Sequence, residues 1–463
     1  MAVPEILSLV MVAAVCGFLF FGYPVALTLG GVSLAFAVLG HFVGAMNVTL
    51  LGALPQRIYG VMTNEVLLAI PLFIFMGVML ERSRIAEDLL ETMGRLFGSL
   101  RGGLGISVAI VGALLAAAKG VVGATTVTMG LIVLPTMLRY GYDKRLAAGT
   151  VAATSTLAQI FPPATVLVLL GDQLSTAYQA AQLAQGNFAP SSVTVSDLFA
   201  GAVVPAFALV AMYILYLIGM AVFFPHTSPA IPRDPDAPAG LALVRRLIAA
   251  LVAPLALILA VLGSILGGIA TPTEAASVGA VGAILLAAIK GTLGSALRPV
   301  VQRTTQVTSM IFLILIGATM FSLVFRGFGG DDMIHRVLGN LPGGATGAIL
   351  AVMLAMFLLG FVMDAFEIIF VVVPIVAVPL LQLHHVDPVW LGIMMAMNLQ
   401  TSYIHPPLGP TLFFLRGVAP PEITTRHIYV GIIPFVVIQL FALTVLWYVP
   451  QLATALPHAL YGR

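Results

Sequence analysis

Long apolar runs separated by short polar segments dominate the pattern of this chain. A run of about 17 or more apolar residues can cross a bilayer as a helix. Two further apolar stretches, at about 104–138 and 346–383, are interrupted near the middle, which predicts re-entrant hairpins that enter and leave on one side. Runs of spanning length predict ten transmembrane helices, at 5–22, 25–45, 64–80, 146–170, 198–224, 247–268, 273–289, 305–325, 389–415 and 428–449.

The two halves of the chain repeat the same landmarks at a fixed distance. Twin prolines interrupt two of the predicted spans, at Pro162-Pro163 and at Pro406-Pro407, 244 residues apart. The same offset relates Pro135 to Pro379 and Asp143 to Asp387. Matching interruptions in two halves are typical of transporters built from internal repeats. We therefore expect a first repeat at 1–224, a cytoplasmic linker at 225–246 and a second repeat at 247–463, with broken helices at about 146–170 and 389–415.

Composition and charge fix the class and the expected orientation. Of the 463 residues, 60% are hydrophobic and 8% are charged, whereas a soluble domain is about 25% charged. With the loop 139–145 in the cytoplasm, most of the 20 Lys and Arg residues also fall in cytoplasmic segments, as the positive-inside rule requires. Both termini are then periplasmic, and because each half has five spans, the two repeats are inverted relative to each other.

Three other features complete the expected topology. The N-terminus lacks the basic region of a signal peptide, so the first run should be retained as a transmembrane helix. Segments 82–101 and 326–341 precede the two hairpins and are interpreted either as interfacial helices that brace a moving part or as ordinary loop helices. Segment 172–197 carries neither Lys nor Arg and is expected to be an outer loop. Cys16, the single cysteine, excludes an intrachain disulfide and a thiolate metal cluster.

The broken spans carry the first candidate chemistry. One reads Thr154-Ser-Thr-Leu-Ala-Gln-Ile-Phe-Pro-Pro163, and the other reads Asn398-Leu-Gln-Thr-Ser-Tyr-Ile-His-Pro-Pro407. Each proline removes a backbone donor and frees carbonyl groups of the preceding turn. Free carbonyls at membrane depth must be buried or must line a polar cavity. Beside hydroxyl and amide oxygens they would suit Na⁺, although a plain kink is the simpler alternative.

The hairpins carry the charged candidates. Lys119 precedes a Gly-rich turn whose N–H groups could hold an anion, although small residues there could instead serve helix packing. Asp364 and Glu367 lie at i, i+3, on one face of a helix, and each carboxylate would cost about 2.5–3.5 kcal/mol to insert. We expect Lys119 to face one of these carboxylates or a substrate carboxylate. Alternatively, Lys119 extends toward an interface or caps a helix end.

Enzyme chemistry finds no support in the chain. The sequence contains no Walker A, HExxH or GxSxG motif. His405 precedes the second proline pair and could shuttle protons, contact substrate or be structural. Ser402 and His405 lie at i, i+3, but without a recognisable oxyanion loop they do not make a hydrolase. His384 and His385 beside Asp387 resemble a metal cluster only in their spacing.

These motifs together resemble the large membrane subunit of the tripartite ATP-independent periplasmic (TRAP) transporters, over nearly the whole chain. Within that family the chain looks most similar to the branch associated with 2-oxo acids, mannitol and chloroaromatic acids. The resemblance rests on Asn64-Glu-Val-Leu-Leu-Ala-Ile-Pro-Leu-Phe-Ile-Phe-Met-Gly77, Gly120-Val-Val-Gly-Ala-Thr-Thr126, Gly141-Tyr-Asp143, Thr271-Pro-Thr-Glu-Ala275, and Asn398-Leu-Gln-Thr-Ser402 with the proline pairs.

The resemblance implies a Na⁺-coupled importer of the bacterial inner membrane. A periplasmic binding protein delivers a small organic acid, a small four-helix membrane subunit packs on the large one, and the hairpins and broken helices move as an elevator. No cofactor other than Na⁺ as coupling ion, and no nucleic acid, is implied. The implied sodium ligands are Gly120, Gly123, Thr125, Thr126, Thr154, Ser155, Thr156, Pro162, Asp364, Asn398, Thr401, Ser402 and Pro406. The implied substrate contacts are Lys119, Gly123, Ala124, Gln159, Asp364, Glu367, Gln400 and His405.

Two departures and two alternatives bear on this reading. Lys119 stands where the family pattern leads us to expect a small polar residue, and His405 where threonine is frequent, so Lys119 could replace one bound Na⁺. The first alternative is a stand-alone Na⁺- or H⁺-coupled anion transporter of the same fold class. The second is a channel, which would not need two occluding hairpins.

Overall fold

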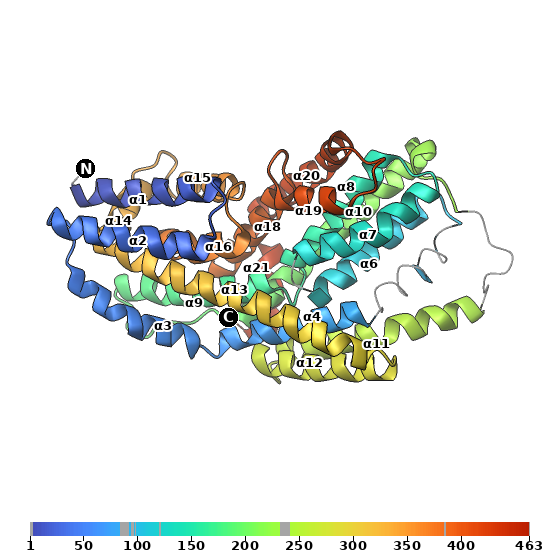
Figure 1. The fold of residues 1–463 in the computed structure, drawn as a ribbon, viewed down its shortest axis with the longest axis horizontal. Coiled ribbons are helices and arrows are strands. Elements are labelled where there is room, and N and C mark those ends of the chain that lie inside the picture. Colours follow the sequence, from blue (N-terminus) through green and yellow to red (C-terminus); the bar gives the residue numbers. More distant parts are fainter. Residues whose placement is uncertain are drawn as a thin grey trace.

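The computed structural model describes residues 3–83, 92–93, 97, 99–119, 122–231, 241–383 and 386–462 (Figure 1). For residues 118–119 and 241–250 it describes the backbone alone. Every regular element in these ranges is a helix, as the apolar pattern predicts. Gly120, His384, His385 and most of the predicted interfacial segment 82–101 lie outside the described residues.

The N-terminal half has helices over the stretches for which the first hairpin and the first broken helix are predicted. α6 and α7 form the first hairpin, and α8, η3 and α9 form the first broken helix. The elements of this half are α1 (Val3–Phe20), α2 (Val25–Phe42), η1 (Val48–Ala53), α3 (Leu54–Met62), η2 (Val66–Leu68), α4 (Ala69–Arg82), α6 (Gly103–Lys119), α7 (Val122–Arg139), α8 (Lys144–Thr156), η3 (Leu157–Gln159), α9 (Thr165–Ala184) and α10 (Val195–Phe223).

The C-terminal half follows the same order. α15, α16 and α17 form the second hairpin, and α18 and α19 form the second broken helix. The elements are η4 (Pro225–Thr227), α11 (Leu241–Leu266), α12 (Pro272–Ile289), α13 (Leu293–Gly327), α14 (Gly330–Gly339), α15 (Gly344–Leu359), α16 (Ala365–Val371), α17 (Val373–Gln382), α18 (Pro388–Ile404), α19 (Pro410–Val418), α20 (Thr425–Tyr448) and α21 (Gln451–Tyr461).

Equivalent residues begin equivalent helices. The Asp143 carboxylate accepts the backbone N–H groups of Arg145 (2.9 Å) and Leu146 (3.1 Å) at the start of α8. The Asp387 carboxylate accepts the N–H of Trp390 (2.9 Å) at the start of α18. A side-chain oxygen at this position satisfies donors that have no partner inside the helix. The 244-residue offset in the sequence therefore corresponds to the same local structure in both halves.

The number of long apolar helices agrees with a multi-pass membrane protein. Seven helices in the described part of the chain are long and apolar enough to cross a membrane, or up to nine if two bent pairs each count as one span. The bent pairs are Val48–Met62 with Val66–Arg82, at 54°, and Ala365–Val371 with Val373–Gln382, at 57°. The two predicted broken helices are absent from this set: α8, α18 and α19 are too short, and α9 is long enough but too polar.

Several expected boundaries differ from the structure. The predicted outer loop 172–197 is wrong in its first half, because α9 continues to Ala184 through residues that favour helices, mainly Ala, Gln and Leu. α13 begins at Leu293, well before the predicted span at 305–325. α3 and α21 were not predicted, since neither forms a long apolar run. The helix expected within 326–341 is present as α14.

Helices of the first half pack against helices of the second half. α4 packs along α12, and α2 packs along α13. In Figure 1, α2 and α4 of the first half are blue, and α12 and α13 of the second half are yellow. Glycine permits both contacts: a Cβ added to Gly279 of α12 would lie 2.6 Å from Met76 Sδ of α4, and one added to Gly317 of α13 would lie 2.5 Å from the Ala26 carbonyl oxygen of α2. Similarly, α9 packs on α17 and α19 packs on α7. Each half is thus completed by helices of the other.

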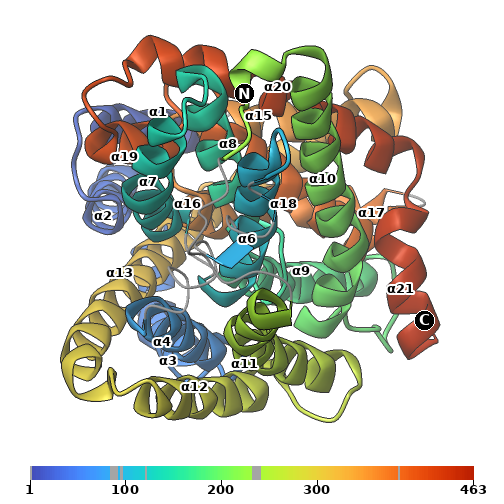
Figure 2. The same ribbon diagram turned by 90° about the vertical axis from the view of Figure 1, so that its right-hand side faces the viewer.

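The two broken helices lie in the interior. Every residue of α18 is buried, and every residue of α8 from Leu146 to Thr156 is buried. In the end-on view of Figure 2, α18 and α16 are drawn inside the ring formed by α2, α12, α10 and α21. α20 closes against α8 so tightly that a Cβ on Gly149 would lie 2.0 Å from the Gly431 carbonyl oxygen. The polar residues of the broken helices are therefore held inside a helical shell.

Candidate functional site

The first broken helix ends in three buried hydroxyl residues. The hydroxyls of Thr154, Ser155 and Thr156 donate to backbone carbonyls one turn earlier, at 2.7, 2.7 and 2.8 Å. Such bonds use the hydroxyl hydrogen and leave oxygen lone pairs for other partners. After η3 the chain passes through Pro162 before α9 begins at Thr165. The predicted ligand run is therefore buried and placed at a helix break.

The second broken helix is tied to the second hairpin. The Asn398 amide donates to the Met353 carbonyl of α15 over 2.7 Å, and a Cβ on Gly360 would lie 2.3 Å from Ser402 Oγ. The hydroxyls of Thr401 and Ser402 donate to carbonyls of their own helix, at 2.9 and 2.7 Å. Helix α18 ends at Ile404, two residues before Pro406. Asn398 and Ser402 thus contact hairpin 2 directly.

The two broken helices meet at equivalent residues. The Gln400 amide donates to the Thr156 hydroxyl over 3.4 Å, and these residues are 244 positions apart, the same offset that relates the proline pairs. The Gln439 amide of α20 also donates to Thr156, over 3.4 Å, and to the Tyr213 hydroxyl of α10, over 2.7 Å. Thr156 is therefore the point at which the two broken helices and α20 meet.

The tip of the first hairpin is only partly described. Gly120 and the Lys119 side chain lie outside the described residues, so the predicted pairing of Lys119 with Asp364 or Glu367 stays a prediction. Gly123 lies against Phe414 of α19, 3.1 Å from where its Cβ would be. Thr125 and Thr126 are fully buried, and the Ala124 carbonyl accepts a hydrogen bond from Thr128 at 2.9 Å.

The tip of the second hairpin brings its two carboxylates together. Asp364 directly precedes α16, and Glu367 lies in its first turn, where its carboxylate accepts the Asp364 N–H over 2.9 Å. Glu367 is only 6% exposed, whereas Asp364 is half-buried. The Tyr403 hydroxyl of α18 donates to the Asp364 carboxylate and accepts the Ala365 N–H at 3.4 Å. The carboxylates are therefore adjacent, but Asp364 stands before the helix rather than on its face.

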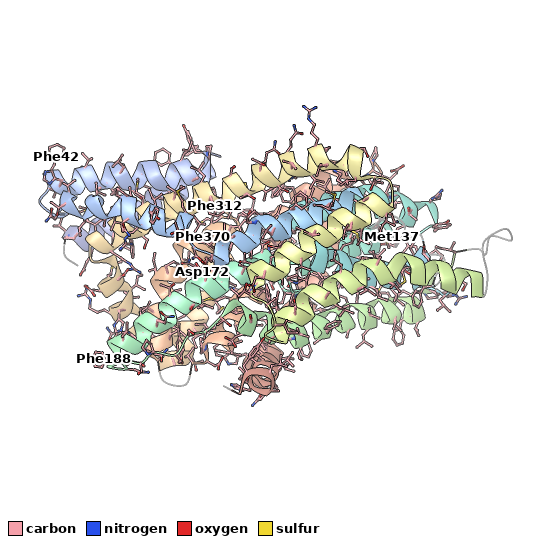
Figure 3. The ribbon with its side chains drawn as sticks, turned by 90° about the horizontal axis from the view of Figure 1, so that it is seen from below. Phe42, Met137, Asp172, Phe188, Phe312 and Phe370 are labelled. Atoms are coloured by element: carbon pink, nitrogen blue, oxygen red, sulfur yellow. The ribbon has the colours of Figure 1, made fainter. Side chains whose placement is uncertain are left out.

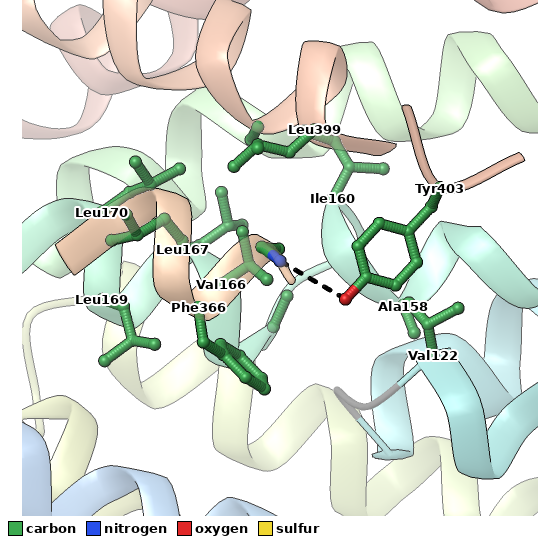
Figure 4. Close-up of a cluster of buried hydrophobic side chains, with 14 of the residues drawn as sticks. Val122, Ala158, Ile160, Val166, Leu167, Leu169, Leu170, Phe366, Leu399 and Tyr403 are labelled. Atoms are coloured by element: carbon green, nitrogen blue, oxygen red, sulfur yellow. Dashed lines mark hydrogen bonds between the residues drawn. The ribbon is translucent and has the colours of Figure 1, made fainter. Parts of the chain in front are cut away.

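Figure 4 shows how these elements converge. Val122 at the start of α7, Ala158 and Ile160 at the break of the first broken helix, Phe366 of hairpin 2 and Tyr403 of the second broken helix belong to one cluster of buried side chains. The Tyr403 hydroxyl points toward the backbone of hairpin 2, where the dashed line marks its bond. Both hairpins and both broken helices therefore supply residues to the same region.

Buried polar atoms without partners gather in this region. More than half of such side-chain atoms in the described part of the chain belong to the broken helices and to Gln439 beside them. Native proteins pair nearly all buried polar atoms, so each exception needs a ligand, a water or a functional reason. These atoms are both amide atoms of Gln159, the Oε1 atoms of Gln400 and Gln439, Nδ1 of His405, and the hydroxyls of Thr165 and Thr411.

His405 has an aromatic setting. Its ring lies edge-on to Phe357, with centroids 4.9 Å apart, and tilted against Phe361 at 5.4 Å. Both phenylalanines flank the end of α15 in hairpin 2, and the His405 side chain remains partly exposed. The structure therefore places this predicted substrate contact between the hairpin and the broken helix.

Three residues of the site were missed by sequence reasoning. Tyr403 and Gln439 contact the predicted site residues Asp364 and Thr156, and Tyr213 accepts a hydrogen bond from Gln439, but only Tyr403 lies inside a singled-out motif. Gln439 carried a readable signal, because it is an uncharged polar residue alone in an apolar span. Tyr213 lies in a run of apolar and aromatic residues, and nothing there distinguishes it from a packing residue.

A family model identifies the family of this chain. Residues 10–452 match the model described as "Tripartite ATP-independent periplasmic transporter, DctM component". The chain belongs to this family. TRAP large permeases are transporter subunits, which confirms that the chain is a transport protein rather than an enzyme.

Relatives in the family match almost end to end. The C4-dicarboxylate TRAP transporter large permease protein DctM of Rhodobacter capsulatus is 28% identical, over 95% of this chain and 98% of its own length. The ectoine TRAP transporter large permease protein TeaC of Halomonas elongata is 25% identical, over 96% and 98%. The 2,3-diketo-L-gulonate TRAP transporter large permease protein YiaN of Escherichia coli is 23% identical, over 83% and 85%.

A solved structure shares the fold. The YdaH transporter of Alcanivorax borkumensis superimposes with a TM-score of 0.63, covering 86% of this chain and 87% of that chain. The two sequences are 16% identical, so the likeness concerns the fold alone.

Proposed function

We propose that this chain is the translocation subunit of a Na⁺-coupled, binding-protein-dependent secondary importer of small organic carboxylates. The observation that carries the proposal is the set of unpaired buried polar atoms at the broken helices, in a member of a transporter family. A site that must bind and release a solute keeps hydrogen-bonding groups that the protein itself does not satisfy. Gln159 and Gln400 would contact the substrate from the two halves.

The coupling ions would bind beside the substrate. Hydroxyl and carbonyl oxygens at the end of α8, near Thr154 and Pro162, would form one Na⁺ site with the tip of hairpin 1. Those at the end of α18, near Ser402 and Pro406, would form the other with Asp364 of hairpin 2. Lys119 would supply a fixed positive charge for a substrate carboxylate, or would replace one Na⁺.

The crosswise helix packing supports an inverted repeat. Helices α2 and α4 of the first half pair with α13 and α12 of the second, and Gln400 meets its equivalent Thr156. In the elevator that we propose, these four helices are the scaffold, and the hairpins with the broken helices move against it. Figure 3 supports the expected orientation: Phe42 and Phe188, near predicted outer segments, lie at one end, and Met137, near the loop 139–145, lies toward the other.

The assembly would follow the family. A small four-helix subunit would pack on this chain in the bacterial inner membrane, and a periplasmic binding protein would deliver the solute. The alternative remains a stand-alone Na⁺- or H⁺-coupled anion transporter of the same fold class. The relatives described above are named for C4-dicarboxylates, ectoine and 2,3-diketo-L-gulonate, so the substrate must be determined by experiment.

Component omission tests this proposal. The chain is reconstituted into proteoliposomes alone or with its small subunit, and uptake of radiolabelled 2-oxo acids and aromatic carboxylates is followed with and without the binding protein. The proposal expects uptake only when all three components are present. Equal uptake by the large subunit alone would favour the stand-alone transporter.

A further inference from the structure

Hairpin 2 is fastened to α18 at three successive levels. The Asn398 amide bonds to Met353, Ser402 packs against Gly360 at a distance that leaves no room for a Cβ, and Tyr403 bonds to the hairpin tip. The first contact ends on a backbone carbonyl, and the second ends on a glycine, which has no side chain. Only the Tyr403 contact ends on an ionisable side chain, the Asp364 carboxylate.

The Tyr403 hydroxyl holds two neighbouring groups at once. It donates to the Asp364 carboxylate and accepts the N–H of Ala365, at 3.4 Å. Tyr403 is 5% exposed and Ala365 is 2% exposed, so the contact is shielded, whereas Asp364 itself is half-buried. Asp364 is also the N-cap of α16, where it forms a capping box with Glu367, so its carboxylate is oriented both by the Tyr403 hydroxyl and by the backbone of the first turn.

The described residues of the first half show no counterpart of this contact. By the 244-residue offset, Tyr403 corresponds to Gln159 and Asp364 corresponds to Gly120. The Gln159 amide is buried and has no partner among the described residues. The two halves therefore differ at this position: the Gln159 amide of the first half has no hydrogen-bond partner among the described residues, whereas the Tyr403 hydroxyl of the second half donates to the Asp364 carboxylate.

We infer that Tyr403 is a positioning residue, which orients the Asp364 carboxylate as a ligand of the coupling Na⁺ at the second hairpin. This inference rests on the proposed function, because it assigns a role within the same site. A hydrogen bond from a neutral donor to a carboxylate fixes its orientation and supports its charged form. Without the hydroxyl, Asp364 would be oriented by the first turn of α16 alone, more of its ordering would fall to the ion, and the affinity for Na⁺ would fall.

The test measures Na⁺ binding directly, without a substrate. Thermal unfolding of the purified chain with its small subunit is recorded over a range of NaCl concentrations, with choline chloride holding ionic strength constant. The Na⁺ concentration that gives half of the stabilisation is the readout. Tyr403→Phe keeps the ring and removes the hydroxyl, Asp364→Asn removes the charge, and Tyr216→Phe is the matched control, since its ring packs edge-on against Phe435.

We expect Tyr403→Phe to raise the half-stabilising Na⁺ concentration about tenfold, which corresponds to about 1.4 kcal/mol. Asp364→Asn should raise it at least as much, Tyr403→Phe should add nothing in the Asp364→Asn background, and Tyr216→Phe should stay within about twofold of wild type. An unchanged value in Tyr403→Phe, with or without a lower melting temperature in the absence of Na⁺, would overturn the inference. If the wild type itself ignores Na⁺, the proposed coupling fails first.

Discussion

Gln159 offers a test in which stability and transport should move in opposite directions. Its side chain is 1% exposed, and neither amide atom has a hydrogen-bond partner among the described residues. An unsatisfied buried polar group costs about 1–3 kcal/mol, whereas an apolar side chain of similar volume avoids this cost. Gln159→Leu should therefore stabilise the substrate-free protein by about 1–3 kcal/mol.

The same change should impair transport. If the amide contacts the solute, its loss removes a hydrogen bond worth about 1.5–3 kcal/mol when the partner is a carboxylate. That range corresponds to a fall in apparent affinity of roughly tenfold to a hundredfold. Uptake into proteoliposomes gives KM, and thermal unfolding in detergent gives stability, from the same preparation.

Gln182 is the matched control. It is also buried, but its amide is satisfied: Nε2 donates to the Ser191 carbonyl at 2.9 Å, and Oε1 accepts the Ser191 N–H at 3.0 Å. Gln182→Leu should destabilise the protein and leave KM unchanged. If Gln159→Leu behaves in the same way, the Gln159 amide is a structural group and the argument from unpaired atoms is refuted.

Two further variants test the packing and the polar contact at the centre. Gly149→Ala would place a Cβ 2.0 Å from a backbone carbonyl oxygen of α20, and it should destabilise the protein by about 1–3 kcal/mol or more. Gly17→Ala is the control, because Gly17 has open space around it, and it should have little effect on stability. Thermal unfolding of the two variants makes the comparison. Thr156→Val leaves the Gln400 amide without its acceptor, so it should lower the free energy of unfolding by about 1–3 kcal/mol and reduce uptake. Thr150→Val is the control, because it loses only a hydrogen bond within α8. Equal melting temperatures of the two variants would contradict the contact between Gln400 and Thr156.

Local features of the fold were readable because they depend on short-range chemistry. The 244-residue offset paired Asp143 with Asp387, which cap equivalent helices, and the proline pairs predicted breaks beyond the ends of α8 and α18. The first half of segment 172–197 was misread as a loop, since a missing positive charge says nothing about helix propensity. Hydropathy alone also could not separate α3 and α21 from loops.

The site was predicted only in part, because its contacts are distant in sequence. The runs around Thr156 and Gln400 were identified from their polar residues, but their direct contact follows from the packing of two halves. Tyr403 reaches Asp364 across 39 positions, and Gln439 reaches Tyr213 across 226, so no local spacing indicates either pair. The sodium and substrate roles of the predicted residues stay predictions.

Na⁺-driven accumulation is the measurement that tests the central claim most directly. Proteoliposomes containing the large and small subunits, with the binding protein outside, are given either an inward Na⁺ gradient or equal Na⁺ on both sides at the same membrane potential. The account predicts that a transported carboxylate accumulates above its external concentration only with the gradient, and that a Na⁺ ionophore releases it. Accumulation that is indifferent to the Na⁺ gradient would contradict the account.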